Sequence, residues 1–357
     1  MSKPGELRAL TSARGIAAWL VVFYHIRESL PPVPAPVMAV LDHGYLAVDF
    51  FFVLSGFVIA LAWRDRVRAS GWAAVPGFLR RRFARVWPLH AVVLTGGVVL
   101  ALLLWATGRH DETEFPFAEL PLHFLLIQNW GFTSALAWND PAWSISAEFA
   151  AYLVFPAIVL AIPARRLPSV ALIGAIAALI AALAGYFALS GTTDLGHDIA
   201  RHGVIRCLAG FSIGMLVHAL WSRRLSGAAP IAIAVATAAT IAWSIGWLPQ
   251  TAAIPTVFAS LLLALATTDP RSLGHPILHR LGEWSYATYL AHFLMWKAFK
   301  LAFVSAGGPV PWPLIALYAA MVLAASAFLY RFVEMPAQAW INRRRVAGAP
   351  SGTPALR

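Results

Sequence analysis

Residues 44–63 read GYLAVDFFFVLSGFVIALAW, an apolar stretch in which Asp49 is the only charged side chain. A helix of roughly 20 apolar residues is long enough to cross the hydrocarbon core of a bilayer. Lipid offers the backbone no hydrogen-bond partners, so a spanning segment must be a helix or part of a closed barrel. Barrel strands alternate polar and apolar residues, and this stretch does not. It therefore predicts a transmembrane helix.

Similar apolar runs recur along the whole chain. Hydrophobic residues make up 60% of the sequence and charged residues 12%, which is about half the charged share of a soluble domain. We predict an all-α, polytopic membrane protein: a single domain at 1–340 and a basic, disordered tail at 341–357. About ten transmembrane helices are expected, at 9–28, 44–63, 86–107, 143–162, 169–190, 202–221, 229–247, 250–268, 285–304 and 311–333.

The basic residues predict how the helices are oriented. There are 27 Lys and Arg against 16 Asp and Glu, and in membrane proteins such residues collect in cytoplasmic loops. Residues 64–85 contain seven arginines, whereas 108–142 contain five carboxylates and Arg109 alone. This asymmetry places both termini in the cytoplasm and predicts a multi-pass protein of the inner membrane. We expect membrane lipids, and no nucleic acid, as partners.

Ionisable side chains inside the membrane are costly and usually face a cavity or a partner. Arg14 and His25 are eleven residues apart, so they share a face of the first helix about 16 Å apart along its axis. The predicted orientation brings His25, Asp49 and Glu148 to the outer leaflet, where they are candidates for acid–base catalysis. Asp49 could orient a histidine or neutralise an arginine, and pairing of either carboxylate with Arg206 is the structural alternative.

Arginines form a second group of candidates, near the cytoplasmic face. Arg82 and Arg85 are three residues apart and share a helix face, and Arg14 is expected at the same depth. Guanidinium groups bind phosphate oxygens in a bidentate fork, which suits a polyphosphate ligand. Contact with lipid headgroups is the alternative, and we favour it for Arg80 and Arg81.

Three further features have mainly structural interpretations. Gly56 follows Ser55, and small residues of this kind let helices approach closely. The lone Cys207 is expected to be a small buried hydrophobe. His292 lies in the ninth predicted helix, where a structural hydrogen bond is favoured over catalysis. No metal site is expected.

The order of these motifs resembles the acyltransferase 3 family of membrane acyltransferases, from about residue 7 to residue 336. Six blocks appear in sequence: Arg14 with His25, Val48–Phe57, Arg82–Arg85 with Trp87-Pro88, Trp143–Glu148, Leu281–His292 and Val333–Pro336.

The resemblance implies transfer of an acyl group, often acetyl, from cytoplasmic acyl-coenzyme A to a hydroxyl of an extracytoplasmic polysaccharide or glycolipid, with no permanently bound cofactor. His25 would act as general base or carry the acyl group transiently, with Asp49 or Glu148 orienting it. Arg14, Arg82 and Arg85 would hold the donor phosphates, and Arg206 and His292 would support the site. A transporter or flippase remains the rival class, because buried Arg, His and Asp also mark substrate and proton paths. The other multi-spanning acyltransferase group is a third option, but it lacks this block order.

Overall fold

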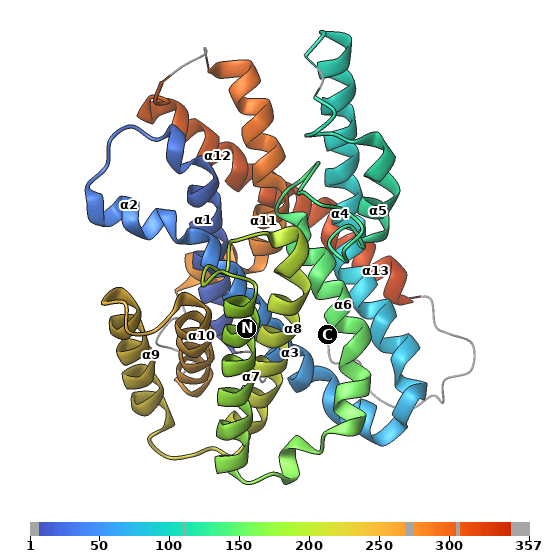
Figure 1. The fold of residues 1–357 in the computed structure, drawn as a ribbon. Coiled ribbons are helices and arrows are strands. Elements are labelled where there is room, and N and C mark those ends of the chain that lie inside the picture. Colours follow the sequence, from blue (N-terminus) through green and yellow to red (C-terminus); the bar gives the residue numbers. More distant parts are fainter. Residues whose placement is uncertain (1–6, 110, 269–274, 305–307, 344–357) are drawn as a thin grey trace.

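The computed structural model describes residues 7–109, 111–268, 275–304 and 308–343, which are predominantly helical and contain no strand (Figure 1). Each of the ten apolar runs corresponds to a long helix. The bounds of these helices are α1 Arg8–Ile26, α3 Ala47–Ser70, α4 Val75–Ala106, α6 Ala142–Ala161, α7 Ser169–Leu189, α8 Ile199–Trp221, α9 Ala228–Ser244, α10 Gln250–Thr267, α11 Pro276–Phe303 and α12 Trp312–Leu329.

By length and composition, seven stretches of the described chain are apolar enough to cross a membrane, and one of these, Ala35–Ala106, contains both α3 and α4. The prediction of a multi-pass helical protein is therefore confirmed. The count of ten spans and the cytoplasmic termini stay predictions. The tail expected at 341–357 lies outside the described residues from 344 onward, and 341–343 still belong to a helix.

Helix ends differ most from the sequence prediction around the arginine-rich segment. Helix α3 continues to Ser70, and α4 begins at Val75, eleven residues before the apolar run at 86–107. Arginine is a good helix former, so the helix continues past the point where the apolar pattern stops. As a result, Arg82 and Arg85 lie on the same helix as the apolar run that follows them.

Short helices are harder to predict. Helices α2 (Ala35–Asp42) and α13 (Met335–Arg343) have no long apolar run, and α12 leads into α13 through a π-helical turn at Tyr330–Glu334. In the segment Leu120–Trp130, the helix is confined to α5 (Leu120–Leu125). It ends there because Leu126 adopts the left-handed conformation, with φ at 60°.

Contacts between distant helices define two ends of the bundle. Arg14 and His25 of α1 contact Ser285 and His292 of α11 respectively, so these two helices run in the same direction. We call the end at which α1 finishes the histidine end, and the opposite end, where α4 begins, the arginine end. Helix α12 returns from the histidine end, and Glu334 beyond it pairs with Arg85 of α4.

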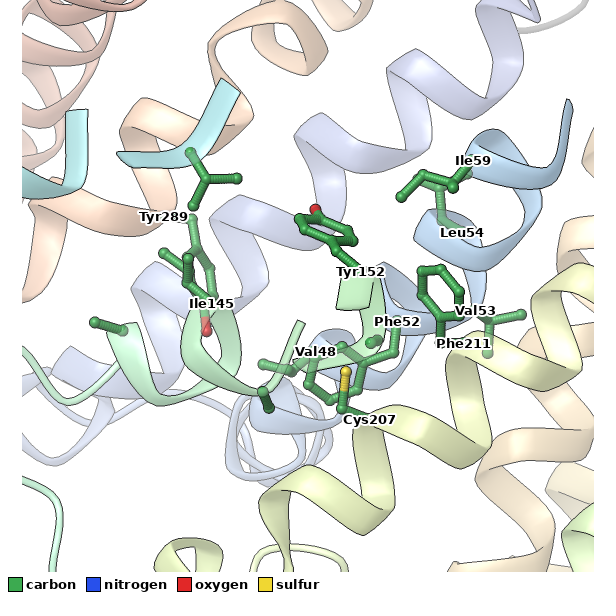
Figure 2. Packing of buried hydrophobic residues seen from close by; sticks show 14 of the residues in the cluster. Val48, Phe52, Val53, Leu54, Ile59, Ile145, Tyr152, Cys207, Phe211 and Tyr289 are labelled. Atoms are coloured by element: carbon green, nitrogen blue, oxygen red, sulfur yellow. The ribbon is translucent and has the colours of Figure 1, made fainter. Parts of the chain in front are cut away.

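Glycines allow the helices that carry the site to cross at close range. A Cβ at Gly214 of α8 would lie 1.9 Å from the Val53 carbonyl oxygen of α3, and one at Gly56 would lie 1.9 Å from the Phe211 carbonyl oxygen. The close-contact role predicted for Gly56 is therefore confirmed. Cys207 is buried in the same apolar cluster as residues of α3 and α6, in agreement with its predicted role (Figure 2).

The orientation can be tested with reporter fusions at residues 115 and 350. Because basic residues stay on the cytoplasmic side, we expect position 115 to report the outer side and position 350 the cytoplasm. An alkaline phosphatase and a fluorescent protein fused at each position would give opposite activity patterns. The same side for both positions would contradict the ten-span arrangement, which places an odd number of spans between them.

Candidate active site

His25 is held at the end of α1 with one ring nitrogen engaged. Its Nδ1 lies 2.8 Å from the Val21 carbonyl oxygen and 3.1 Å from Nε2 of His292. A carbonyl can only accept, so Nδ1 of His25 carries the hydrogen when the ring is neutral. Nε2 of His25 is then unprotonated and can accept a proton from a hydroxyl group.

His292 supports this arrangement from α11. Its Nδ1 lies 3.1 Å from the Thr288 carbonyl oxygen and donates to it, which leaves Nε2 as an acceptor facing His25. The side chain is fully buried, and the Tyr318 hydroxyl donates to the His292 carbonyl oxygen. The predicted structural hydrogen bond is therefore present. The direct contact with His25 is not predictable from the sequence, because no spacing rule aligns two helices that are far apart along the chain.

Asp49 makes an ion pair with Arg206. Nε of Arg206 donates to Oδ1 of Asp49 at 2.8 Å, and Nη2 donates to Oδ2 at 2.6 Å, while Nη1 donates to the Leu195 carbonyl oxygen. The Asp49 side chain is 6% exposed and the Arg206 side chain is 1% exposed. This bidentate pair between α3 and α8 is the structural alternative that the sequence left open, and it occupies both oxygens of the carboxylate.

A cavity of about 170 Å³ lies between α1, α3, α4, α6 and α11, and we call it the arginine cavity. Its lining includes Arg14, Arg82, Arg85 and Glu148. Arg14 donates to Oγ of Ser285 from Nη2 at 3.0 Å. The structure thus brings together the three arginines that were predicted to bind one ligand.

Arg82 and Arg85 differ in what holds them. Nε of Arg82 is buried and finds no hydrogen-bond partner among the described residues. Arg85 forms an ion pair with Glu334, whose side chain is 1% exposed. Buried donors without a partner are rare in proteins and usually have a reason. Of the three arginines in the cavity lining, Arg82 is therefore the one with a buried donor that a ligand could satisfy. The sequence marks Glu334 only as part of the block Val333–Pro336. Its pairing with Arg85 could not be predicted, because the two residues are 249 positions apart.

The predicted grouping of Glu148 with His25 is not what the structure shows. Glu148 lies in the arginine cavity, near Arg14 and within hydrogen-bonding reach of the Tyr152 hydroxyl. The reason is its depth: Glu148 is six residues inside α6, almost two turns below the start of the helix. Three nearby arginines supply its opposite charge. Any role of Glu148 is therefore exerted from this cavity.

Tyr289 contacts both the arginine cavity and the histidine pair. Tyr289 and Ser144 line the cavity, and their hydroxyl oxygens are 2.7 Å apart. On its other side the Tyr289 ring lies near the His292 ring, with 6.2 Å between centroids. Along α11 the order is therefore cavity, Tyr289, His292. Among the described residues, no group of three His, Cys, Asp or Glu is placed to hold a metal ion.

Known proteins of one family are similar to this chain over nearly its whole length. The acyltransferase domain model matches residues 7–331. Acyltransferase MdmB of Streptomyces mycarofaciens is 32% identical over 380 aligned residues, which cover 97% of this chain and 95% of that protein. Protein 2 in the picA locus of Rhizobium radiobacter is 32% identical over 171 residues, covering 43% of this chain and 83% of that protein. No solved structure matches. The chain therefore belongs to the acyltransferase 3 family and is an O-acyltransferase.

Proposed function

We propose that the protein transfers an acyl group, acetyl in the first instance, from cytoplasmic acyl-coenzyme A to a hydroxyl of an extracytoplasmic carbohydrate or glycolipid. It does so in the inner membrane, without a permanently bound cofactor. Three features follow one another along α11: the arginine cavity, Tyr289, and His292 with its partner His25. This order is the observation that most directly supports the proposal. A phosphate-bearing donor suits the arginines, and proton transfer suits the histidine.

The arginine cavity is too small for the whole donor. Sites for drug-sized ligands usually measure about 300–1,000 Å³, whereas this cavity measures about 170 Å³. We therefore assign the phosphates to its arginine-lined mouth and the narrow pantetheine arm to its interior. Tyr289 lines the cavity and also lies near the His292 ring, so we assign Tyr289 and Ser144 to the inner end, which the arm would pass for the thioester to reach His25.

The reaction can then follow one of two balanced routes. In the first, Nε2 of His25 takes the acceptor proton while the acceptor oxygen attacks the thioester carbonyl. The carbon–sulfur bond breaks, and the leaving thiolate takes the proton from the imidazolium. In the second, Nε2 attacks the thioester carbonyl, the carbon–sulfur bond breaks and coenzyme A leaves as the thiolate. The acceptor oxygen then attacks the acyl-imidazolium, the carbon–nitrogen bond breaks to restore neutral imidazole, and the acceptor proton passes to the thiolate. In both routes the His292 contact holds the His25 ring in its reactive tautomer.

The donor site is tested by Arg82→Ala. Loss of one charge-assisted contact should cost about 1.5–3 kcal/mol of donor binding, which is about a tenfold to hundredfold weaker affinity. Binding of acetyl-coenzyme A to purified protein would be measured by calorimetry. Arg80→Ala is the control, because Arg80 lies on the same helix but not in the cavity lining. Equal losses for both variants would favour a diffuse contact with lipid headgroups.

Arg85→Ala should behave differently from Arg82→Ala. It removes a contact to the donor but also leaves Glu334 buried without its partner, which typically costs about 3–5 kcal/mol of stability. We expect a lower unfolding temperature for Arg85→Ala and rescue of that temperature in Arg85→Met with Glu334→Gln. Donor binding should stay weak in the rescued double variant. Full recovery of donor binding would show that Arg85 is structural only.

A further inference from the structure

A second cavity, of about 820 Å³, opens at the histidine end. Its walls come from the last turns of α4 and α11, from the loop that follows α4, and from Ser29 beyond α1. The backbone N–H of Val310 donates to the Ser29 carbonyl oxygen at 2.7 Å and closes one side. We call this cavity the amphipathic cleft.

The cleft adjoins the histidine pair on the side away from the arginine cavity. Ser29 is four residues beyond His25, and the Phe293 ring lies 5.3 Å from the His25 ring and 4.5 Å from Nζ of Lys297, which lines the cleft. Along α11 the sequence runs from Tyr289 through His292 to Lys297. A ligand in the cleft would therefore approach His25 from the side opposite the donor.

The walls of the cleft are of two kinds. One is aliphatic and is formed by four side chains of α4, α11 and the residue after it: Leu100, Leu104, Leu301 and Val304. The other is charged. Glu114 pairs with Lys297, and in the part of the chain that the structure describes this leaves Arg109 and Lys300 without an acidic partner.

We propose that the amphipathic cleft binds the acceptor and that the acceptor is an anionic glycolipid. Its hydrocarbon would lie on the aliphatic wall, its phosphate or carboxylate would meet Arg109 and Lys300, and a sugar hydroxyl would reach Nε2 of His25. A free polysaccharide would leave the aliphatic wall unused. This inference rests on the proposed function, because it takes His25 as the centre of transfer.

Photo-crosslinking in the native host tests the assignment, because it captures whichever molecule occupies the cleft in the cell. The photoreactive residue p-benzoylphenylalanine would replace Leu104 in the cleft or, as a matched control, Leu103, which is 60% exposed on the outside of the bundle. We expect the Leu104 adduct to contain sugar, an acidic group and hydrocarbon by mass spectrometry, and the Leu103 adduct to contain phospholipid. Phospholipid alone at both positions would overturn the proposal.

A charge variant separates failure of the cleft from failure of the proposed function. Lys300→Gln should lower acyl transfer about tenfold or more, while acetyl-coenzyme A binding is unchanged. Arg201→Gln is the control, since Arg201 is an exposed basic residue at the start of α8 outside the cleft. If the wild-type protein transfers no acyl group, the proposed function is wrong, and if His25→Ala still transfers acyl groups, His25 is not the centre of transfer. If His25 is required but Lys300→Gln transfers normally and Leu104 adducts lack sugar, only the cleft assignment is wrong.

Discussion

Replacing His25 with alanine is expected to abolish acyl transfer while leaving expression and donor binding largely intact. Of the two imidazoles in the histidine pair, only that of His25 has an Nε2 that remains free to accept a proton. Its Nδ1 is held by the Val21 carbonyl oxygen and by His292. Removal of a general base or nucleophile typically lowers a rate by about 10²–10⁴-fold or more. Ester content of the acceptor fraction and binding of acetyl-coenzyme A would be measured on the same preparations.

The glutamine variant makes this result specific. His25→Gln keeps a hydrogen-bonding side chain but cannot take up a proton near neutral pH. We expect it to be as inactive as the alanine variant. Near-normal transfer by His25→Gln would mean that His25 only holds the structure together. His292→Gln should retain part of the activity, because its role is to orient the His25 ring.

Splitting the Asp49–Arg206 pair should cause a large loss of stability. Asp49→Ala would leave a guanidinium that is 1% exposed without its carboxylate, which typically costs about 3–5 kcal/mol. Thermal unfolding of the detergent-purified protein would measure the loss. Asp42→Ala is the matched control, because Asp42 pairs with Arg27 at a site where its side chain is 52% exposed. Such surface pairs contribute about 0–1 kcal/mol.

Replacing Asp49 and Arg206 together distinguishes a structural role of the pair from a catalytic one. The double variant Asp49→Leu with Arg206→Met removes both charges and should recover most of the stability, as apolar replacements of buried ion pairs often do. If the pair is structural, transfer activity recovers with it. A stable double variant without activity would instead support the catalytic role that the sequence suggested for Asp49.

The helices and the arginine cavity could be predicted because they depend on local patterns. Apolar runs of bilayer length must be helical in lipid, and Arg82 and Arg85 share a face wherever their helix lies. The grouping of Arg14 with them followed from depth alone. Helix ends beyond the membrane were predicted poorly, because α4 continues through its arginines after the apolar signal has stopped.

Lateral contacts could not be predicted, because depth does not specify which neighbours a residue meets. For Asp49 the sequence left two partners open, His25 and Arg206, and the structure shows Arg206. Glu148 was expected at the outer level but lies in the arginine cavity. His25 and His292 are in contact although they are 267 residues apart in the chain, and Arg85 and Glu334 are in contact although they are 249 residues apart. Close packing at Gly15 and Gly282 brings α1 and α11 together, and the sequence does not show which two helices meet at a given glycine.

Membrane vesicles of known orientation test the central claim most directly. Radiolabelled acetyl-coenzyme A, which does not cross membranes, would be added to inside-out and right-side-out vesicles that contain the native acceptor. If the donor binds at the arginine end and transfer occurs at His25, labelled ester should form in inside-out vesicles only. Inside-out vesicles that contain His25→Ala should form no labelled ester. Equal labelling of sealed right-side-out vesicles would contradict the account, because donor and acceptor would then meet on the same side.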